Sequence, residues 1–322
     1  MSKLAVSVAG LPLEFPVMLG SGPLGVRGKD LLEFGAVAGG IVTKSITPEP
    51  CAGSPTPRIV KVDQDAMLNY EGNPNPGIDN FSDTLREVIP SIPCPVIGSI
   101  APDALREENT LEYMVEKFVG AGVKGIELDY KYLYKKSVGL THFEPKELAT
   151  ICARVRSVAK VVLVVKLAVG FIPLPDLAKA AEDGGADAIS AINTLFPAMR
   201  IQLRSRRPTL STTYGGLSGR PVRTMAIAAI YELRQITTLP LIGIGGAKTA
   251  EDVVEFLLAG ASAVQVYTAA QLEGPKVFSE LRRELPALIE KLKAPSVSSL
   301  IGAAHVTGSV DEAQTEDEVV IA

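Results

Sequence analysis

The stretch LIGIGGAKTAEDVVEFLLAGASAVQVYT, residues 241–268, decides the fold class of this chain. It opens with an apolar run, Leu241 to Ile244, which continues into the glycine pair Gly245-Gly246. A segment with helically spaced apolar residues then runs from Ala250 to Ala259, and a second apolar run spans residues 263–266. The order strand, glycine turn, helix and strand is the repeating unit of a parallel α/β fold.

The glycine pair predicts a phosphate-binding site. Glycine has no Cβ, so backbone amides at this turn can approach a ligand closely. The N-terminus of the helix that follows carries a partial positive charge, which favours an anion. Late in an α/β chain, this pattern suggests the phosphate of a flavin or of a sugar phosphate.

Eight short apolar runs, rich in Val and Ile, recur along the chain. They are Val17–Gly20, Gly40–Lys44, Val96–Ile100, Gly125–Asp129, Val161–Leu167, Ala186–Ile192, Leu241–Ile244 and Ala263–Val266. Strands buried on both faces have this pattern. Helical segments are expected at Ala104–Val119, Pro145–Ser157, Leu174–Asp183, Arg223–Gln235 and Ala250–Ala259. Eight units predict a (β/α)₈ TIM barrel, with a doubly wound parallel sheet as the alternative.

Three further features complete the predicted organisation. Two extended pieces, Leu4–Val8 and Leu11–Phe15, predict an N-terminal β-hairpin that caps the barrel floor. Long connections at residues 45–95 and 193–222 follow strands 2 and 6, and we expect them to rise as loops over the active face. We expect one barrel domain over residues 1–308 and an acidic, flexible tail over residues 309–322.

Composition limits the function classes. The chain has 322 residues, of which 47% are hydrophobic, and a net charge of −4, which argues against a nucleic-acid partner. Three cysteines without CxxC spacing and two histidines argue against a metal site and favour a reducing cytoplasm. No apolar run is long enough to span a membrane. Cys51 has no histidine near it in sequence and is interpreted as packing within its loop.

Polar and glycine residues cluster where the predicted strands end. Lys44 and Lys166 stand out, because each ends or interrupts a run that should be buried, and a buried lysine needs an anionic partner. Barrel enzymes place their chemistry at this end of the strands. Two such lysines facing one pocket predict a bound anion or an electron-rich ring.

Several motifs resemble one known family. They are IVTKSITPEPCAGSPTPRI (41–59), MLNYEGNPNPGIDNF (67–81), INTLFPAMRI (192–201), GGLSGRPV (215–222) and GIGGAKTAEDVVEFLLAGASAVQVYTA (243–269). In this order they look like the class 1 dihydroorotate dehydrogenases, and the resemblance runs nearly end to end. It implies an FMN-binding barrel that oxidises dihydroorotate to orotate. It also implies a homodimer and a separate electron-transfer subunit as a further partner.

The resemblance assigns residues to the flavin. It implies that Gly20, Ser21 and Gly22 lie along the isoalloxazine ring, with Lys44 and Ser45 near it and Lys166 beside N1 and O2. It implies that the ribityl phosphate is surrounded by Gly216, Gly245, Gly246, Tyr267 and Thr268. The family usually has glycine at the position of Tyr267.

The substrate side is only partly retained. Asn69, Gly72 and Asn73, with Lys44, match the family segment that holds the orotate carboxylate, and Asn193 and Thr194 match a pair that faces the pyrimidine. The family motif Asn-x-Ser-Cys-Pro-Asn is replaced by DYKYLY, residues 129–134. Its catalytic cysteine thus becomes Tyr132, and its two asparagines become Asp129 and Tyr134. Glu71 is unfavourable beside a substrate carboxylate unless it points outward.

Three hypotheses follow. The first is an FMN-dependent oxidoreductase that transfers hydride between flavin N5 and a C–C bond of a small, anionic substrate other than dihydroorotate. Tyr132 would then give or take the proton, and Lys44 would assist at the catalytic centre; alternatively, Tyr132 only packs. The second is an authentic dihydroorotate dehydrogenase with an unusual base. The third is a flavin-binding protein without redox turnover, or a sugar-phosphate aldolase or isomerase barrel without flavin.

Overall fold

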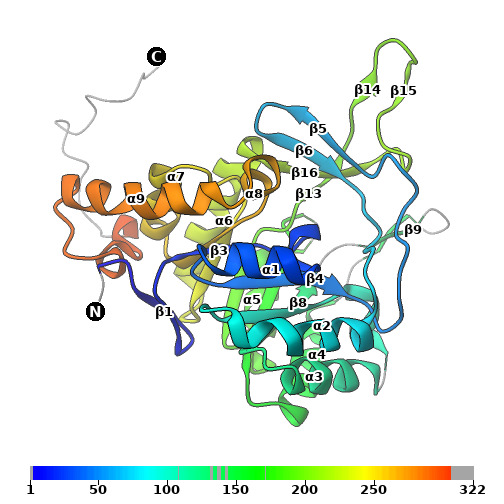
Figure 1. Cartoon of the computed structure of the whole chain (residues 1–322), viewed down its shortest axis with the longest axis horizontal. Helices are drawn as coiled ribbons and strands as arrows, with labels where there is room; N and C mark the ends of the chain where they lie inside the picture. The colour runs from blue at the N-terminus through cyan, green and yellow to red at the C-terminus, as the bar shows by residue number, and fades with distance from the viewer. Residues whose placement is uncertain are drawn as a thin grey trace.

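A closed barrel of eight parallel strands forms the centre of the molecule, as predicted (Figure 1). The computed structural model describes residues 3–107, 109–130, 133–135, 139–141, 144–170 and 172–305, with only the backbone for 133–135 and 139–141. In barrel order the strands are β3 (Val17–Leu19), β4 (Ile41–Ile46), β7 (Val96–Ile100), β8 (Gly125–Tyr130), β11 (Val162–Leu167), β12 (Ala188–Ala191), β17 (Leu241–Ile244) and β18 (Ala261–Val266). Each overlaps a predicted run, because strands buried on both faces carry continuous apolar sequence.

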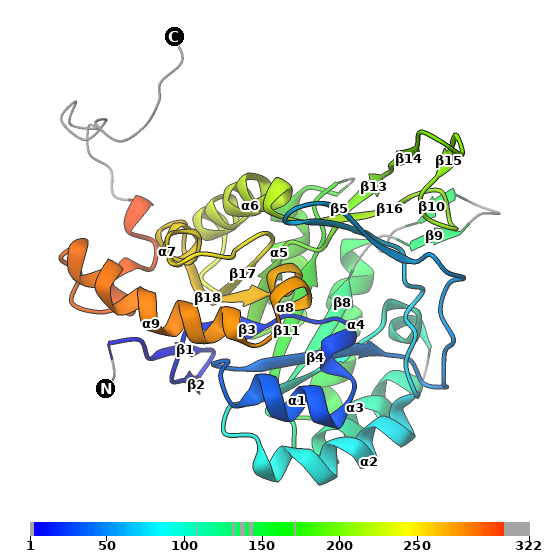
Figure 2. The same cartoon turned by 45° about the horizontal axis from the view of Figure 1, so that its top comes forward.

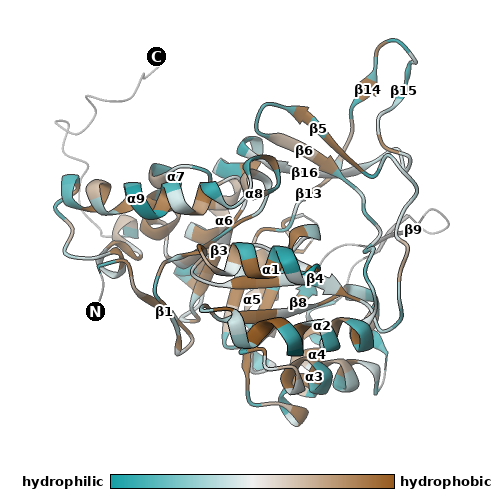
Figure 3. Cartoon of the chain, viewed as in Figure 1, coloured by the Kyte–Doolittle hydropathy of each residue, from teal (hydrophilic) through white to brown (hydrophobic). Residues whose placement is uncertain are grey.

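Amphipathic helices surround the barrel. They are α1 (Gly28–Gly35), α2 (Ile78–Val88), α3 (Thr110–Gly120), α4 (Pro145–Val158), α5 (Leu174–Asp183), α6 (Arg223–Ile236), α7 (Ala250–Leu258), α8 (Thr268–Glu273) and α9 (Lys276–Lys291). Short 3-10 segments lie at Pro23–Gly25, Ile89–Ser91, Pro102–Arg106, Arg220–Val222, Val297–Leu300 and Ala303–His305. Figure 3 shows hydrophobic and hydrophilic stripes on α2, α3 and α9. In α2 the buried stripe includes Phe81 and Leu85, which face the core.

The two long connections follow strands 2 and 6 and rise over the cavity face, as predicted, but they contain strands and a helix of their own. Strands β5 (Ile59–Asp63) and β6 (Ala66–Asn69) follow β4, and α2 lies in the same connection. The second connection contains β13 (Leu195–Ala198), β14 (Ile201–Gln202), β15 (Arg207–Pro208) and β16 (Gly215–Gly219). The two connections join in a four-stranded sheet of order β13-β16-β6-β5 (Figure 1), in which Gly216 pairs with Asn69. This pairing links distant parts of the chain, which local sequence patterns do not reveal.

The predicted N-terminal hairpin is confirmed. Strand β1 (Val6–Val8) pairs antiparallel with β2 (Leu11–Leu13). The side chain of Leu13 lies beside Gly40, directly before the start of β4. In both views the hairpin lies on the opposite side of the barrel from the β5–β6 sheet (Figures 1 and 2). It therefore covers the amino-terminal ends of the barrel strands.

A second short hairpin follows the barrel strand β8. Strands β9 (Leu133–Lys135) and β10 (Gly139–Thr141) form a short hairpin after β8. The expected acidic tail, residues 309–322, lies outside the described residues. Across the described ranges, no helix combines the length and the apolar composition that a membrane span requires.

Candidate active site

A cavity of about 420 Å³ opens where the barrel strands end and the β13-β16-β6-β5 sheet covers them. Its volume falls in the range of pockets that enclose small organic ligands. Sixteen of the residues predicted for cofactor or substrate line it: Ser21, Gly22, Lys44, Ser45, Asn69, Gly72, Asn73, Asp129, Lys166, Asn193, Thr194, Gly216, Gly245, Gly246, Tyr267 and Thr268. The tertiary structure thus brings both predicted lysines to one pocket.

Three predicted residues do not appear in this lining. Gly20 lies behind the wall, where an added Cβ would be 3.4 Å from side-chain atoms of Gln265 and Ile244. Tyr132, the predicted catalytic residue, lies outside the described residues. Tyr134 belongs to β9, of which only the backbone is described.

In the glycine turn after β17, the backbone lies close to a neighbouring segment and to the cavity. Gly245 and Gly246 have φ angles of 136° and 83°, which side-chain-bearing residues rarely adopt. A Cβ on Gly246 would lie 2.6 Å from the carbonyl oxygen of Gly219. No described residue accepts a hydrogen bond from the backbone N–H of Gly245, Gly246 or Ala247. These donors are therefore available to a ligand in the cavity.

The sequence predicted that the start of the helix after the glycine turn, α7, would face the ligand, but the structure places the start of another helix there. The amides directly before α7 are not available, because Asp252 Oδ2 accepts hydrogen bonds from the backbone N–H groups of Lys248 and Thr249. The short helix α8 begins instead at the cavity, with Thr268 in its wall. Thr268 Oγ1 donates a 2.9 Å hydrogen bond to Ser218 Oγ, so strand β16 closes this end of the pocket. A short helix after the eighth strand is a recurrent phosphate site in barrels of this kind.

Lys166 presents a buried charge to the cavity. It is 6% exposed, and its side chain forms no hydrogen bond or ion pair with any described residue. Below it lies Glu127, whose pKa is raised by burial and lowered in part by the charge of Lys166. A buried ammonium group without a direct partner is costly. The arrangement therefore fits a site that is completed by an electron-rich or anionic ligand.

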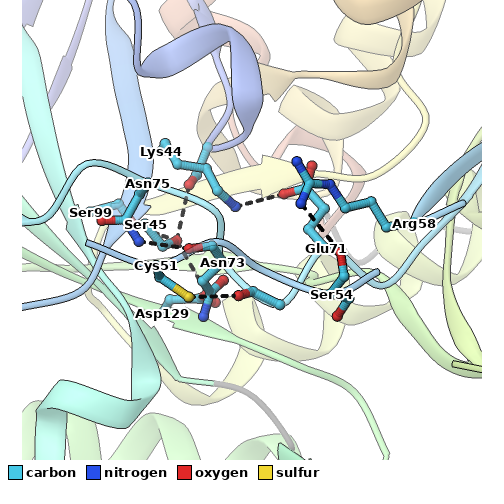
Figure 4. Close-up of polar contacts among 12 residues, drawn as sticks. Lys44, Ser45, Cys51, Ser54, Arg58, Glu71, Asn73, Asn75, Ser99 and Asp129 are labelled. Carbon is cyan, nitrogen blue, oxygen red and sulfur yellow. Dashed lines mark hydrogen bonds and ion pairs between the residues drawn. The ribbon is translucent and has the colours of Figure 1, made fainter. Parts of the chain in front are cut away.

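Lys44 is different, because the protein supplies its anionic partner. Lys44 Nζ lies 2.6 Å from Glu71 Oε2, and both side chains are buried (Figure 4). A register shift between Val42 and Ser45 in β4 lets consecutive residues, Lys44 and Ser45, both reach the cavity. Glu71 points inward, the orientation that the sequence identified as unfavourable for a substrate carboxylate.

Two neutral side chains donate hydrogen bonds to Asp129. Asn193 Nδ2 donates to its Oδ1 at 2.8 Å, and Ser45 Oγ donates to its Oδ2 at 3.2 Å. Ser45 Oγ also lies within hydrogen-bond distance of Ser99 Oγ and Ser21 Oγ (Figure 4 shows Ser45, Ser99 and Asp129). The amide of Asn193 is thus directed at a carboxylate of the protein.

Tyr267 fills the space that Gly22 leaves. A Cβ on Gly22 would overlap ring carbons of Tyr267. The Tyr267 hydroxyl donates to Gln271 Oε1 at 2.8 Å and accepts from the backbone N–H of Leu24 at 3.3 Å. Burial raises the pKa of this phenol, and the negative charge of Glu71 adds to the effect. Tyr267 therefore serves as a neutral wall of the cavity.

Several cavity residues were not predicted as site residues. Ser218 and Arg220 lie inside the quoted motif GGLSGRPV, so the motif itself could have indicated them. Lys248 lies just after the glycine turn and forms ion pairs with Asp65 and Glu273. Across the described residues, no group of three or more His, Cys, Asp or Glu side chains could hold a metal ion. Cys51 donates to the carbonyl of Gly72 at 3.3 Å, which accords with loop packing.

Comparison with known proteins identifies relatives over nearly the whole chain. The family model described as Dihydroorotate dehydrogenase matches residues 3–289. A protein of Geobacillus kaustophilus named "Dihydroorotate dehydrogenase B (NAD(+)), catalytic subunit" is 36% identical over 312 residues, covering 96% of this chain and 98% of the relative. A protein of Geobacter sp. with the same name is 36% identical over 303 residues, with coverages of 93% and 97%.

A solved structure shares the fold. The crystal structure of DHODH in complex with ferulenol from Eimeria tenella superposes with a TM-score of 0.79 and 23% sequence identity. The match covers 95% of this chain and 89% of that one.

Proposed function

The chain belongs to the dihydroorotate dehydrogenase family, whose members are FMN-dependent oxidoreductases acting on CH–CH groups, and we propose that this member acts on a small molecule other than dihydroorotate. The observation that carries the flavin part of the proposal is Lys166, buried in the cavity wall without a direct partner. The observation that carries the substrate part is the sequence DYKYLY at residues 129–134, in place of the family motif.

The residues present fit FMN. The free amides of Gly245 and Gly246, the start of α8 and the hydroxyl of Thr268 would hold the phosphate. Ser21, Gly22, Lys44 and Ser45 would lie along the ring, as the resemblance implies. FMN would supply a two-electron hydride acceptor or donor at N5. The positive charge of Lys166 would stabilise the negative charge of the reduced cofactor and raise its potential.

The proton in this reaction is assigned to Tyr132 on sequence alone. Tyrosine has an ordinary pKa near 10, so it suits a proton donor in the reductive direction. As a base it would need a lowered pKa, which Lys131, Lys135 and Lys136 would provide through their positive charge. The substitution Tyr132→Phe would then abolish turnover and leave FMN content unchanged.

The experiment that tests the proposal has two stages. First, the absorption spectrum of the purified protein gives the FMN content per chain. Second, anaerobic reduction of the bound flavin is followed with dihydroorotate and with a panel of other saturated small molecules. We expect about one FMN per chain, slow or absent reduction by dihydroorotate and turnover-rate reduction by another compound. Colourless protein that takes up no FMN would contradict the flavin part.

An authentic dihydroorotate dehydrogenase is the second candidate. It is favoured by the names of relatives at 36% identity and by Lys44, Asn69 and Asn193, which line the cavity as in the family pattern. Turnover of dihydroorotate with a common electron acceptor, lost in Tyr132→Phe, would establish this candidate over the first.

The assembly is also a proposal. We propose a homodimer, as the family resemblance implies, and a separate electron-transfer subunit, because the relatives are named catalytic subunits. Light scattering on the purified chain would test the dimer. Co-purification of a redox protein with the chain would test the second subunit.

A further inference from the structure

The lysine that should hold a substrate carboxylate already carries one. Lys44 Nζ and Glu71 Oε2 are 2.6 Å apart, and their side chains are 6% and 8% exposed. Both residues line the cavity, so the pair faces the ligand rather than solvent. The two charges largely cancel at this distance, which leaves little net attraction for an anion.

Hydrogen bonds hold the backbone of the loop that carries Glu71. The carbonyl oxygen of Glu71 accepts a 2.7 Å hydrogen bond from Ser54 N, and the neighbouring Tyr70 N donates to the Arg58 carbonyl at 2.8 Å. Close packing reinforces the hold, because a Cβ on Gly53 would lie 2.5 Å from the Glu71 oxygen. The loop therefore fixes the backbone of Glu71, and the ion pair with Lys44 holds its buried side chain inward.

A second carboxylate lies in the same wall. Asp129 is 3% exposed and lines the cavity. The donors Asn193 and Ser45 are both engaged with it, at 2.8 and 3.2 Å. Asn193 and Ser45 thus donate to Asp129 rather than to a ligand. A ligand at this part of the wall meets the Asp129 carboxylate.

With Lys166 assigned to the flavin, two carboxylates and one compensated lysine remain to face the substrate, and they disfavour a negatively charged one. An incoming carboxylate would have to displace Glu71 from Lys44 and would then meet its negative charge in a buried site, where like charges repel strongly. Carboxylate oxygens are acceptors only, so they select ligands that present N–H or O–H donors. Within the proposed oxidoreductase function, we infer that Glu71 makes the site selective for an uncharged, hydrogen-bond-donating substrate and excludes carboxylates. This inference replaces the anionic substrate that the sequence suggested.

The test compares two probes that differ by one carboxylate, uracil and orotate. Their dissociation constants are measured by titration calorimetry on the flavin-loaded wild type, on Glu71→Gln and on Glu49→Gln. Glu49 is a matched control, because it is an exposed glutamate in the same connection. We expect wild type to bind uracil at least as tightly as orotate. We expect Glu71→Gln to strengthen orotate binding at least about tenfold relative to uracil, and Glu49→Gln to change neither.

Each outcome decides the inference. Tighter binding of orotate than of uracil by wild type, or an unchanged ratio in Glu71→Gln, would overturn it. If wild type binds neither probe, Glu71→Gln decides: measurable orotate binding supports the inference, and none overturns it. Thermal melting confirms that the variants are folded. FMN content is measured separately, and a protein that takes up no flavin would contradict the proposed function. The same titrations on the flavin-free protein would then still give the selectivity ratio.

Discussion

Gln265 of β18 and Glu127 of β8 meet across the interior of the barrel, where Gln265 Nε2 donates a 3.0 Å hydrogen bond to Glu127 Oε2. Three strands separate β8 from β18 in either direction around the barrel, so the contact passes through its centre. Ser190 Oγ donates to the same oxygen at 3.0 Å. Glu127 Oε1 has no hydrogen-bond partner among the described residues. This network forms a polar layer beneath the cavity.

The pH dependence of stability should reflect Glu127. Burial raises its pKa above the ordinary value of 4.5, so the folded protein holds this proton more tightly than the unfolded chain. The resulting stabilisation is complete below about pH 4.5 and is lost as pH rises through the raised pKa. Glu127→Gln cannot ionise and escapes this loss. We therefore expect the melting temperature of wild type to fall relative to that of Glu127→Gln as pH rises from 4 to 8. Parallel profiles of melting temperature against pH would refute the prediction.

Replacement of Lys166 should separate cofactor binding from stability. Lys166→Met removes a buried charge that lacks a direct partner, so we expect the FMN-free protein to be as stable as wild type or more stable. FMN affinity should fall at least about tenfold, because a charged hydrogen bond contributes about 1.5–3 kcal/mol. Flavin fluorescence titration measures the affinity. Lys124→Met, at an exposed position, serves as the control and should leave both quantities unchanged.

Gly22 and Tyr267 should behave as a complementary pair. In Gly22→Ala the new methyl group overlaps the Tyr267 ring, which must move into the cavity or away from it. We expect FMN affinity to fall at least about tenfold, as for other overpacked sites. The double variant Gly22→Ala/Tyr267→Gly removes the overlap and should recover most of the loss. Gly120→Ala is the control, because a Cβ there meets no atom within 4 Å. Failure of the double variant to recover binding would show that the pair is not coupled.

Phe256 should be a main contributor to stability. It is fully buried on α7, and its ring occupies the space beside Gly243 of β17. Phe256→Ala leaves a cavity between helix and barrel and should cost about 3–5 kcal/mol of unfolding free energy. Leu203→Ala, where the side chain is 89% exposed, should change it by less than about 0.5 kcal/mol. Urea denaturation measures both, and similar losses in the two variants would contradict the assignment.

The site could be predicted in part. Lys44, Lys166 and the glycine pair 245–246 were identified from sequence because each interrupts or ends an apolar run, which is a local signal. The inward direction of Glu71 had no such signal, because it depends on the ion pair with Lys44, which lies 27 residues away in the chain. Resemblance predicted Tyr132 as the proton carrier, and this role stays a prediction.

The sequence by itself determined the eight barrel strands and the helices α3 to α7, and the number of units favoured a barrel over a doubly wound sheet. A strand that is buried on both faces needs a continuous apolar run, and this local pattern can be recognised in the sequence alone. Only the tertiary structure decided that β6 pairs with β16, through Asn69 and Gly216, and that Lys44 meets Glu71 across 27 residues of sequence. Such contacts arise because the closed barrel brings the carboxyl ends of all its strands to one face, where segments far apart in the sequence become neighbours.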